Sequence, residues 1–454
     1  MQSIQLAERV RIHLEEEYFS VDKALLVDHS EYFRALFQSG MRESNQEEIQ
    51  IRDLSAMGFS IMLKILEGSF PVLSCEENLK AVECASFLQV KAMAKYLIAS
   101  INSDNCIILY QAAAMFGLLD LFHSAALYIR DSYADLEEYL DCLSPDLLDY
   151  IESLVPSTFV AVGAHTPTFE FLEDLSRTIC YLNEEDNTWR TLSCMPLTAS
   201  TFLAGMATLD NKIYIVGGTY GHNKQVVDQS FCYDPVTNVW SEFPSPQQLR
   251  YDVTLTAQED YLYAIGGEFE KMPLKSVEKF NMSTNTWSFV SDLPQPATSV
   301  PCTQAMGHIF VCLWKPLDTT IIYEYETQKD EWLPISTLNR SQSYGHCMVA
   351  HRNNLYIMRN GPFDDFLRCV MDCYNLTTKQ WSSLPGQYVN SKGALFTAVI
   401  KGDIVYTVNK MATQIYTIED NTWKSKKERA GFPRSGSLQT FLLRLPRADH
   451  SIAT

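Results

Sequence analysis

The side chains that could do chemistry in this 454-residue chain are dispersed rather than clustered. Cys369 and Cys373 are the closest cysteines, but no second pair and no histidine follows at the spacing of a zinc site. His346 and His351 lie five residues apart on an expected strand and its turn, so they point to different sides. The sequence contains no phosphate-binding loop, dinucleotide-binding fingerprint or zinc-protease motif. We therefore expect no catalytic site, no metal and no cofactor.

Composition excludes further classes of partner. The net charge is −19 and most of it lies in residues 1–157, so the Lys/Arg footprint of a nucleic-acid-binding protein is missing. No apolar run reaches the roughly 18 residues of a membrane-spanning helix, and the N-terminus does not resemble a secretory signal. Twelve unpaired cysteines fit reduced thiols. We expect a cytoplasmic protein that binds neither nucleic acid nor membrane.

The chain changes character near residue 157, where Pro156 and Ser157 mark a boundary. Before it, apolar residues recur at helical spacing after two short strand-like runs, Val10–Leu14 and Tyr18–Val21. After it, short strands alternate with turns rich in Gly, Pro, Asn and Asp. The predicted fold is multidomain: a small α/β domain, a short all-α segment and a large all-β domain.

The all-β region contains a repeat. Six tryptophans recur every 42 to 51 residues, at Trp189, Trp240, Trp287, Trp332, Trp381 and Trp423. An aromatic residue precedes each by seven residues, or by eight for the first: Tyr181, Tyr233, Phe280, Tyr325, Tyr374 and Tyr416. Periods of this size are typical of β-propellers, in which four-stranded blades bury their faces against one another.

With an apolar strand and a glycine pair upstream, this pattern resembles the kelch repeat. Gly217–Gly218 and Gly266–Gly267 match the glycine pair fully, whereas three repeats carry Leu313–Trp314, Arg359–Asn360 and Val408–Asn409 there. The resemblance implies a six-bladed kelch propeller over residues 158–446, followed by a tail at 447–454.

The first repeat lacks its own opening strand before Val160–Val162. The segment Leu438–Leu445 resembles the opening strand of the other repeats. We expect it to pair into the first blade and close the ring, which removes free sheet edges.

The segment Tyr18–Ser44 resembles the BTB (POZ) domain of kelch-containing adaptors. The matching residues are Ser30, Tyr32, Phe33, Ser39, Gly40, Met41 and Glu43. The resemblance implies a BTB domain over residues 1–101 that docks cullin-3 through Met41, Glu43 and Phe37. Without the resemblance, a helix-end Met packed locally beside a solvated Glu remains an open alternative.

Residues 102–157 resemble a BACK domain of about half the usual length. The sequence starts just before the first strand, so most of the helix that family members exchange between protomers is missing. Asp22 also stands where the family usually has a histidine. A homodimer through the BTB domain and a monomer both remain open.

Two sets of loops converge on one face in kelch propellers: those after the glycine-pair positions and those before each opening strand. The residues that these loops offer here are Tyr220, Arg250, Tyr251, Trp314, Arg340, Tyr344 and Arg434. Because Arg and Tyr are common interface anchors, we predict that these residues bind a protein client. The alternative is that they cap strands or stack on neighbouring loops.

Taken over the chain, the resemblance implies a non-catalytic substrate-recognition adaptor of a cullin-3 RING ubiquitin ligase. It further implies a muscle-associated protein with thin-filament components as clients. The alternative is a cytoskeletal scaffold that binds actin thin filaments without a ligase role.

Overall fold

The computed structural model describes residues 8–40, 46–165, 176–220, 225–315, 319–339, 346–361, 368–388, 397–408, 412–427, 431–433 and 435–446. The chain divides into two compact units, with the first ending at Leu154 and the second beginning at Val155. None of the helices in these ranges is long and apolar enough to cross a membrane.

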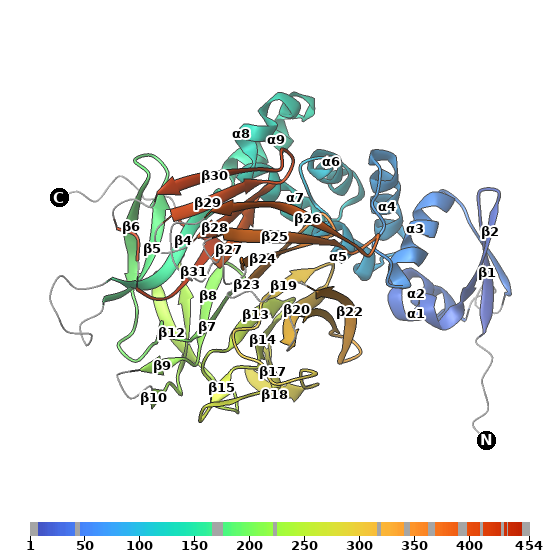
Figure 1. The fold of residues 1–454 in the computed structure, drawn as a ribbon. Coiled ribbons are helices and arrows are strands. Elements are labelled where there is room, and N and C mark those ends of the chain that lie inside the picture. The colour runs from blue at the N-terminus through green and yellow to red at the C-terminus, as the bar shows by residue number, and fades with distance from the viewer. Residues whose placement is uncertain are drawn as a thin grey trace, which may run out of the picture. The chain divides into compact units, whose positions relative to one another are not determined.

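The first unit opens with a three-stranded sheet of order β2-β1-β3 (Figure 1). β1 (Arg9–Leu14) pairs antiparallel with β2 (Glu17–Asp22) and parallel with β3 (Glu48–Ile51). Alternate residues of β1 are buried, as a strand with one face on a core requires.

Five helices cover the buried face of this sheet. They are α1 (Lys23–His29), α2 (Glu31–Gln38), α3 (Ala56–Leu66), α4 (Cys75–Phe87) and α5 (Lys91–Ala99). Ser30 starts α2 because its hydroxyl accepts from the Phe33 N–H at 3.2 Å. Ser74 and Glu77 form a capping box that starts α4. Phe33 and Phe59 lie fully buried at the centre of this core.

A second helical core follows in the same unit. It consists of α6 (Cys106–Phe116), α7 (Leu119–Asp131), α8 (Tyr133–Leu136), the 3₁₀ helix η2 (Glu137–Cys142) and α9 (Pro145–Ser153). Gly117 ends α6 with a φ of 73°, the left-handed conformation that favours glycine at this position. The buried Tyr110 stacks on Phe122 with ring centroids 4.7 Å apart, which joins α6 to α7.

The part of the second unit that the structure describes contains six antiparallel four-stranded sheets and two small two-stranded ones. From the inner to the outer strand, the first three are β31 (Ser435–Leu443), β4 (Thr158–His165), β5 (Ser176–Asn183) and β6 (Thr188–Cys194); β7 (Gly205–Leu209), β8 (Lys212–Val216), β11 (Ser230–Asp234) and β12 (Val239–Phe243); and β13 (Thr254–Gln258), β14 (Tyr261–Ile265), β17 (Val277–Asn281) and β18 (Thr286–Val290).

The fourth to sixth sheets continue the series. They are β19 (Cys302–Ala305), β20 (His308–Lys315), β21 (Thr319–Glu326) and β22 (Glu331–Asn339); β23 (His346–His351), β24 (Asn354–Asn360), β25 (Arg368–Asn375) and β26 (Gln380–Tyr388); and β27 (Thr397–Lys401), β28 (Ile404–Val408), β29 (Ala412–Thr417) and β30 (Thr422–Lys427). All six inner strands contribute to the lining of one central cavity, so the sheets are the blades of a propeller. The predicted fold class, an α/β domain followed by helices and a propeller, is confirmed.

The chain's last described strand lies in the first blade. β31 pairs antiparallel with β4, with Leu443 opposite Thr158 and Ser435 opposite Ala164. The strand nearest the C-terminus therefore pairs with the strand that opens the second unit. This pairing supplies the first blade with an inner strand and closes the ring.

Aromatic pairs join the blades. In blades 2 to 6 the aromatic residue seven positions before the tryptophan lies directly opposite it, with ring centroids 4.7 to 5.2 Å apart. The indole N–H then donates to the preceding blade: Trp287 to the Pro244 carbonyl at 2.6 Å, and Trp332 to the Ser291 carbonyl at 3.0 Å. Each tryptophan therefore both packs within its own blade and bonds to the one before it.

The first blade departs from this pattern. Leu182 lies opposite Trp189, and Tyr181 lies opposite Arg190. The predicted Tyr181–Trp189 pair is therefore wrong, because hairpin register sets the position seven residues before the tryptophan opposite it. Trp189 instead packs against Phe432 with ring centroids 5.0 Å apart.

Candidate functional site

The candidate site is one face of the propeller, which we call the loop face. It consists of the leading loops, which precede each inner strand, and the return loops, which join the second and third strands of each blade. Two small hairpins belong to the return loops: β9 (Thr219–Tyr220) with β10 (Gln225–Val226), and β15 (Glu268–Phe269) with β16 (Met272–Pro273) (Figure 1).

The glycine pairs bring the two loop sets together. Gly217 and Gly218 have φ values of 63° and 93°, which end β8 and start the return loop. A Cβ on Gly217 would lie 2.2 Å from the Arg250 carbonyl oxygen, and one on Gly218 would lie 2.8 Å from the Phe202 carbonyl oxygen. The pair is therefore enclosed between the leading loop of its own blade and that of the next blade.

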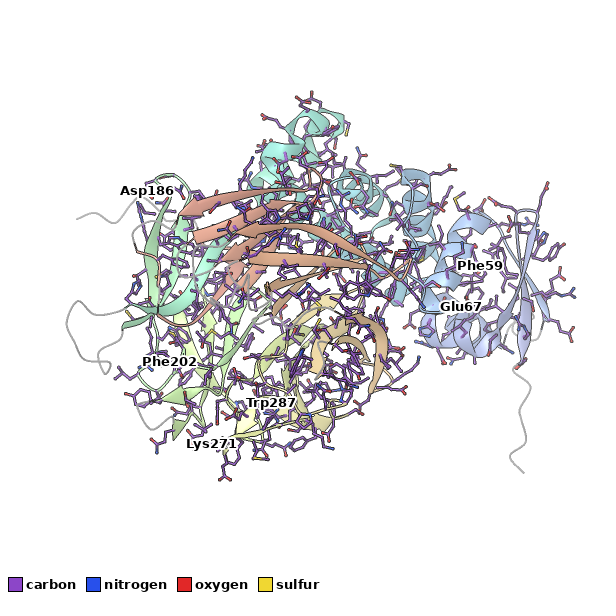
Figure 2. All side chains as sticks on the ribbon, in the orientation of Figure 1. Phe59, Glu67, Asp186, Phe202, Lys271 and Trp287 are labelled. Atoms are coloured by element: carbon purple, nitrogen blue, oxygen red, sulfur yellow. The ribbon has the colours of Figure 1, made fainter. Side chains whose placement is uncertain are left out.

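Tyr220, one of the predicted client contacts, lies on the loop face. Its side chain is 52% exposed, and the Arg177 guanidinium lies over its ring at 5.5 Å. Arg177 also donates to the Leu197 carbonyl at 2.6 Å, so it fixes the leading loop beside the ring. Phe202 bridges to Thr219 next to Tyr220 and is labelled in Figure 2. The aromatic ring is thus held in place and remains open to a partner.

Tyr251 joins the leading and return loops of the third blade. Its backbone pairs with that of Glu268, and its hydroxyl donates to the Glu268 carboxylate. That hydrogen bond to the carboxylate raises the pKa of Tyr251. The pair leaves the Glu268 charge on the loop face with a neutral phenol as its hydrogen-bond donor.

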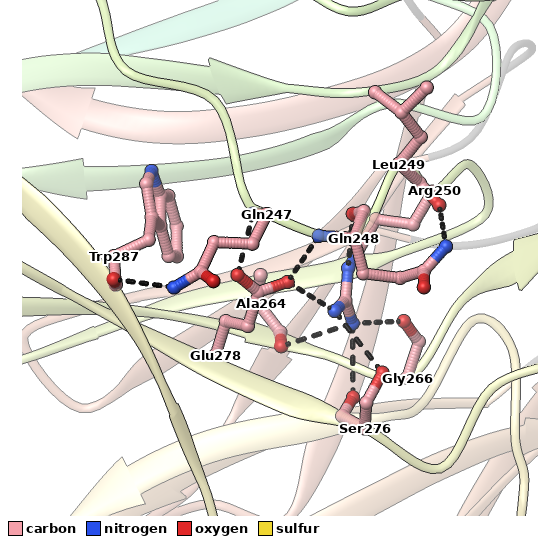
Figure 3. Close-up of polar contacts among 9 residues, drawn as sticks. All are labelled: Gln247, Gln248, Leu249, Arg250, Ala264, Gly266, Ser276, Glu278 and Trp287. Carbon is pink, nitrogen blue, oxygen red and sulfur yellow. Dashed lines mark hydrogen bonds and ion pairs between the residues drawn. The ribbon is translucent and has the colours of Figure 1, made fainter.

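The prediction that Arg250 contacts a client is wrong. Its side chain is fully buried and forms an ion pair with the equally buried Glu278 at 2.6 Å (Figure 3). The guanidinium also donates to the carbonyls of Gly266 and Ser276 at 2.8 and 3.0 Å. Burial lowers the pKa of Arg250, while Glu278 beside it acts in the opposite direction. Arg250 turns inward, where Glu278 and these carbonyls bind its guanidinium.

Glu278 binds the backbone of the leading loop. Its two carboxylate oxygens accept the backbone N–H groups of Gln247 and Gln248 at 2.7 and 3.0 Å (Figure 3). Arg250 and Glu278 together therefore satisfy the polar backbone of a loop that no strand ladder covers. Their role is to position the residues on either side, the exposed Leu249 and the half-buried Tyr251.

Trp314 lies at the edge of a pocket on the loop face. Its side chain is 46% exposed, and Gln295 donates to its carbonyl at 2.6 Å. The pocket, which we call the Trp314 pocket, has a volume of about 310 Å³ and combines leading-loop and return-loop residues. Its lining is Pro273, Gln295, Pro296, Ala297, Thr298, Ser299, Val300, Pro301, Cys312, Leu313, Trp314 and Thr320.

Several predicted site residues lie outside the described residues. On the propeller these are Arg340, Tyr344 and Arg434, and in the first unit they are Met41 and Glu43. Phe37 is described: it lies on α2, stacks on Phe33 and has the Lys23 ammonium 4.9 Å from its ring centroid. Part of the Phe37 ring surface is therefore already in contact with residues of its own domain.

Sequence reasoning missed Arg177, Leu197 and Phe202. Leu197 is 84% exposed in the leading loop of the second blade, and Phe202 lies in the same loop. Their position before an inner strand is the signal that could have identified them, since that signal located Tyr251. Within the described residues, no group of three or more His, Cys, Asp or Glu side chains is placed to hold a metal.

Comparison with known proteins places these two units in a family. The BTB/POZ domain profile matches residues 6–105, and the Kelch motif profile matches residues 201–247 and 249–294. The human protein "Kelch repeat and BTB domain-containing protein 13" is 56% identical over 96% of this chain and 95% of its own length. The chain belongs to the BTB–kelch family. The mouse protein of the same name is 57% identical over the same share of both chains, whereas mouse "Kelch-like protein 42" is 32% identical over 57% of this chain and 59% of its own.

For a BTB–kelch protein, the geometry assigns different work to the two units. The propeller presents a face with an exposed tyrosine, an exposed tryptophan and a pocket between two loop sets. The BTB unit presents helices and a small sheet. Both arrangements suit binding of other proteins, which is the adaptor role of the family.

Proposed function

We propose that this protein is a substrate-recognition adaptor of a cullin-3 ubiquitin ligase. The BTB unit would bind the cullin, and the loop face of the propeller would bind a protein client in the cytoplasm. The observation that carries the proposal is the presence of a BTB/POZ domain and a kelch propeller in one chain. This chain would contribute no catalytic group, and the transfer chemistry would lie in other subunits.

An exposed apolar surface in the BTB unit supports cullin docking. Phe87 at the end of α4 is 40% exposed, and Met115 and Leu119 on either side of Gly117 are 73% and 76% exposed. The Ser86 hydroxyl donates to the Phe116 carbonyl at 2.7 Å, which holds the end of α4 against the turn between α6 and α7. Exposed apolar residues gathered at ordered helix ends are typical of a protein interface.

Aromatic packing connects this surface to the helix that precedes the proposed motif. Tyr32 on α2 packs against Phe87 with ring centroids 5.4 Å apart. Met41 and Glu43 follow α2 in sequence, so a partner that covers Phe87 could continue onto them. The part of the Phe37 ring that does not pack against Phe33 or Lys23 would be available to the same partner.

Co-purification of the full chain with cullin-3 tests the proposal. We expect the wild type to bind, and both Met41→Ala with Glu43→Ala and Met115→Glu with Leu119→Glu to bind at least about tenfold more weakly. The control is Val236→Glu, which changes a 65% exposed residue of the propeller. Absence of binding by the wild type would overturn the function, and wild-type binding by the Met41/Glu43 variant would overturn those two residues as the docking motif.

The client belongs to the proposal as well. The resemblance described from the sequence supports a thin-filament protein, and sedimentation of the full chain with reconstituted thin filaments tests this. We expect pelleting with filaments that Tyr220→Ala and Trp314→Ala reduce. Pelleting without any cullin-3 binding would favour the scaffold alternative, and no pelleting would remove the filament as client.

A further inference from the structure

The mouth of the central cavity on the loop face is surrounded by strained residues. Leu203, Asp252 and Ser299 have φ values of 56°, 52° and 45° at corresponding positions just before the inner strands β7, β13 and β19. Non-glycine residues rarely adopt this conformation, which is strained unless the surroundings hold it. We call these three residues the collar, since all of them line the central cavity.

Hydrogen bonds between neighbouring blades hold the collar. The Asp252 N–H donates to the Leu203 carbonyl at 2.6 Å, and the Ser299 N–H donates to the Asp252 carbonyl at 2.9 Å. The Ser299 hydroxyl also donates to the Asp252 carboxylate, and the Leu203 N–H donates to the Ser437 hydroxyl at 2.9 Å. The collar therefore fixes the Asp252 carboxylate at the mouth rather than leaving it to move freely.

Among the described residues at the mouth, on the leading loops of blades 2 to 4, the charge is negative. The central cavity has a volume of about 1010 Å³, and Asp252 is the single charged residue in the described part of its lining. Across the described residues, no Lys or Arg lies within ion-pair distance of Asp252. The carboxylate of Glu268 is a second negative group nearby, because its hydrogen bond from Tyr251 holds it beside the residue that precedes Asp252. A basic group is therefore the complementary ligand for this mouth.

The Trp314 pocket adjoins the mouth. Ser299, Val300 and Pro301 line both the pocket and the central cavity, so a ligand can occupy both at once. No charged residue lies in the described lining of the pocket, which combines prolines, Leu313 and Trp314. A charged guest would lose its hydration there without gaining an ion pair, whereas an apolar side chain would bury its surface.

We propose that the collar and the Trp314 pocket form one client site that binds a segment carrying a Lys or Arg beside an apolar residue. Asp252 receives the basic group, and Trp314 with its prolines receives the apolar side chain. The inference rests on the proposed client-binding role of the propeller and narrows it to one chemistry. A segment that carries an acidic residue in place of the Lys or Arg is rejected, because Asp252 and Glu268 repel it.

Selection from a random heptapeptide library displayed on phage, with the immobilised full chain as bait, tests the proposal. We expect peptides selected by the wild type to be enriched in Lys or Arg next to an apolar residue. Asp252→Asn should remove the basic preference and weaken the best peptide about tenfold, because asparagine keeps the left-handed backbone but not the charge. Trp314→Ala should remove the apolar preference. The matched controls are Asp260→Asn, an exposed carboxylate at the β13–β14 turn, and Phe289→Ala, a 53% exposed aromatic on β18.

Three outcomes would overturn the site: no selected peptide, selected peptides rich in acidic residues, or preferences that persist in both variants. Melting temperatures of the variants within about 2 °C of the wild type would exclude unfolding as the cause. Cullin-3 binding measured on the same preparations separates this inference from the proposed function. Cullin-3 binding without peptide selection would defeat the client site alone, and peptide selection without cullin-3 binding would defeat the ligase role alone.

Discussion

Blades 3 and 5 bury the same kind of ion pair in two different ways. Each has a carboxylate two residues before the aromatic residue of its third strand, Glu278 before Phe280 and Asp372 before Tyr374. Both carboxylates are buried and both pair with an arginine. In blade 3 the arginine is Arg250, which comes from the leading loop (Figure 3).

In blade 5 the arginine comes from within the sheet. Arg359 on β24 stands where blade 3 has Gly266, and its Nη2 lies 3.0 Å from Asp372. In blade 3 the leading loop supplies the arginine, whereas in blade 5 the second strand supplies it. The lost glycine pair of the fifth repeat is therefore an exchange of one arginine for another rather than a defect. The second to fourth strands of blade 5 are 7 to 9 residues long, against 5 in blade 3.

Removal of Arg250 should have the largest effect. Arg250→Met leaves the buried Glu278 carboxylate without its counter-charge, which we expect to lower the free energy of unfolding by about 3–5 kcal/mol. Urea denaturation followed by tryptophan fluorescence measures it, since all seven tryptophans lie in the propeller. Adding Glu278→Gln should restore part of the loss, because the neutral amide oxygen can still accept a backbone N–H of the leading loop. Lys275→Met, which breaks an exposed pair with Asp292, should cost less than about 1 kcal/mol.

Arg359→Met should cost less than Arg250→Met, about 2–3 kcal/mol. Arg250→Met leaves the buried carbonyls of Gly266 and Ser276 without the donor that Arg250 supplies. Arg359 pairs with Asp372 alone among the described residues, and Asp372 keeps a hydrogen bond from the Ser383 hydroxyl at 3.1 Å after the change. The same denaturation experiment gives both values. An Arg359 variant less stable than the Arg250 variant would contradict the view that the leading-loop arginine contributes more to the free energy of unfolding.

Gly266→Ala tests the close approach between Gly266 and the leading loop of the fourth blade. A Cβ there would lie 2.3 Å from the Ala297 carbonyl oxygen, and the φ of 57° adds its own cost. We expect a loss of at least about 2 kcal/mol. Gly307→Ala is the matched control, because its φ is 85° with nothing within 4 Å of the added Cβ. Equal losses at the two positions would show that the backbone angle alone requires glycine.

The comparison also shows which features the sequence could predict. The spacing of tryptophan and aromatic residues located the blades, because hairpin register places such pairs opposite one another in five of the six sheets. The burial of Arg250 could not be read in the same way. A loop arginine has the same sequence appearance whether it faces solvent or turns inward, and its burial here depends on Glu278, 28 residues away, and on the carbonyls of Gly266 and Ser276. The collar was equally hidden, since Leu203 carries no local signal for a left-handed backbone.

Blade 4 extends the comparison to a partly buried carboxylate that pairs with a histidine. It has Tyr323 where blades 3 and 5 have Glu278 and Asp372, and its acid is Glu324, one residue later, with 15% of the side chain exposed. The nearest partner that the structure records for Glu324 is His308, with Nδ1 at 3.2 Å from Oε1. Burial, with a smaller contribution from Glu326, raises the pKa of Glu324 to about 7. Burial likewise lowers the pKa of His308.

Glu324→Gln should give the smallest of these effects, with an opposite sign and a dependence on pH. The pKa of Glu324 rises on folding from 4.5 to about 7, so the folded state binds its proton more tightly and the protein loses stability as pH rises through that range. The variant removes this loss. We expect it to unfold with about 2 kcal/mol more free energy than the wild type at pH 8 and with nearly the same free energy at pH 4.5. Urea denaturation at the two pH values measures the difference. The exposed Glu331→Gln is the control and should change stability by less than about 0.5 kcal/mol at either pH. A Glu324 variant less stable than the wild type at pH 8 would mean that the carboxylate is ionised and stabilising, as in blades 3 and 5.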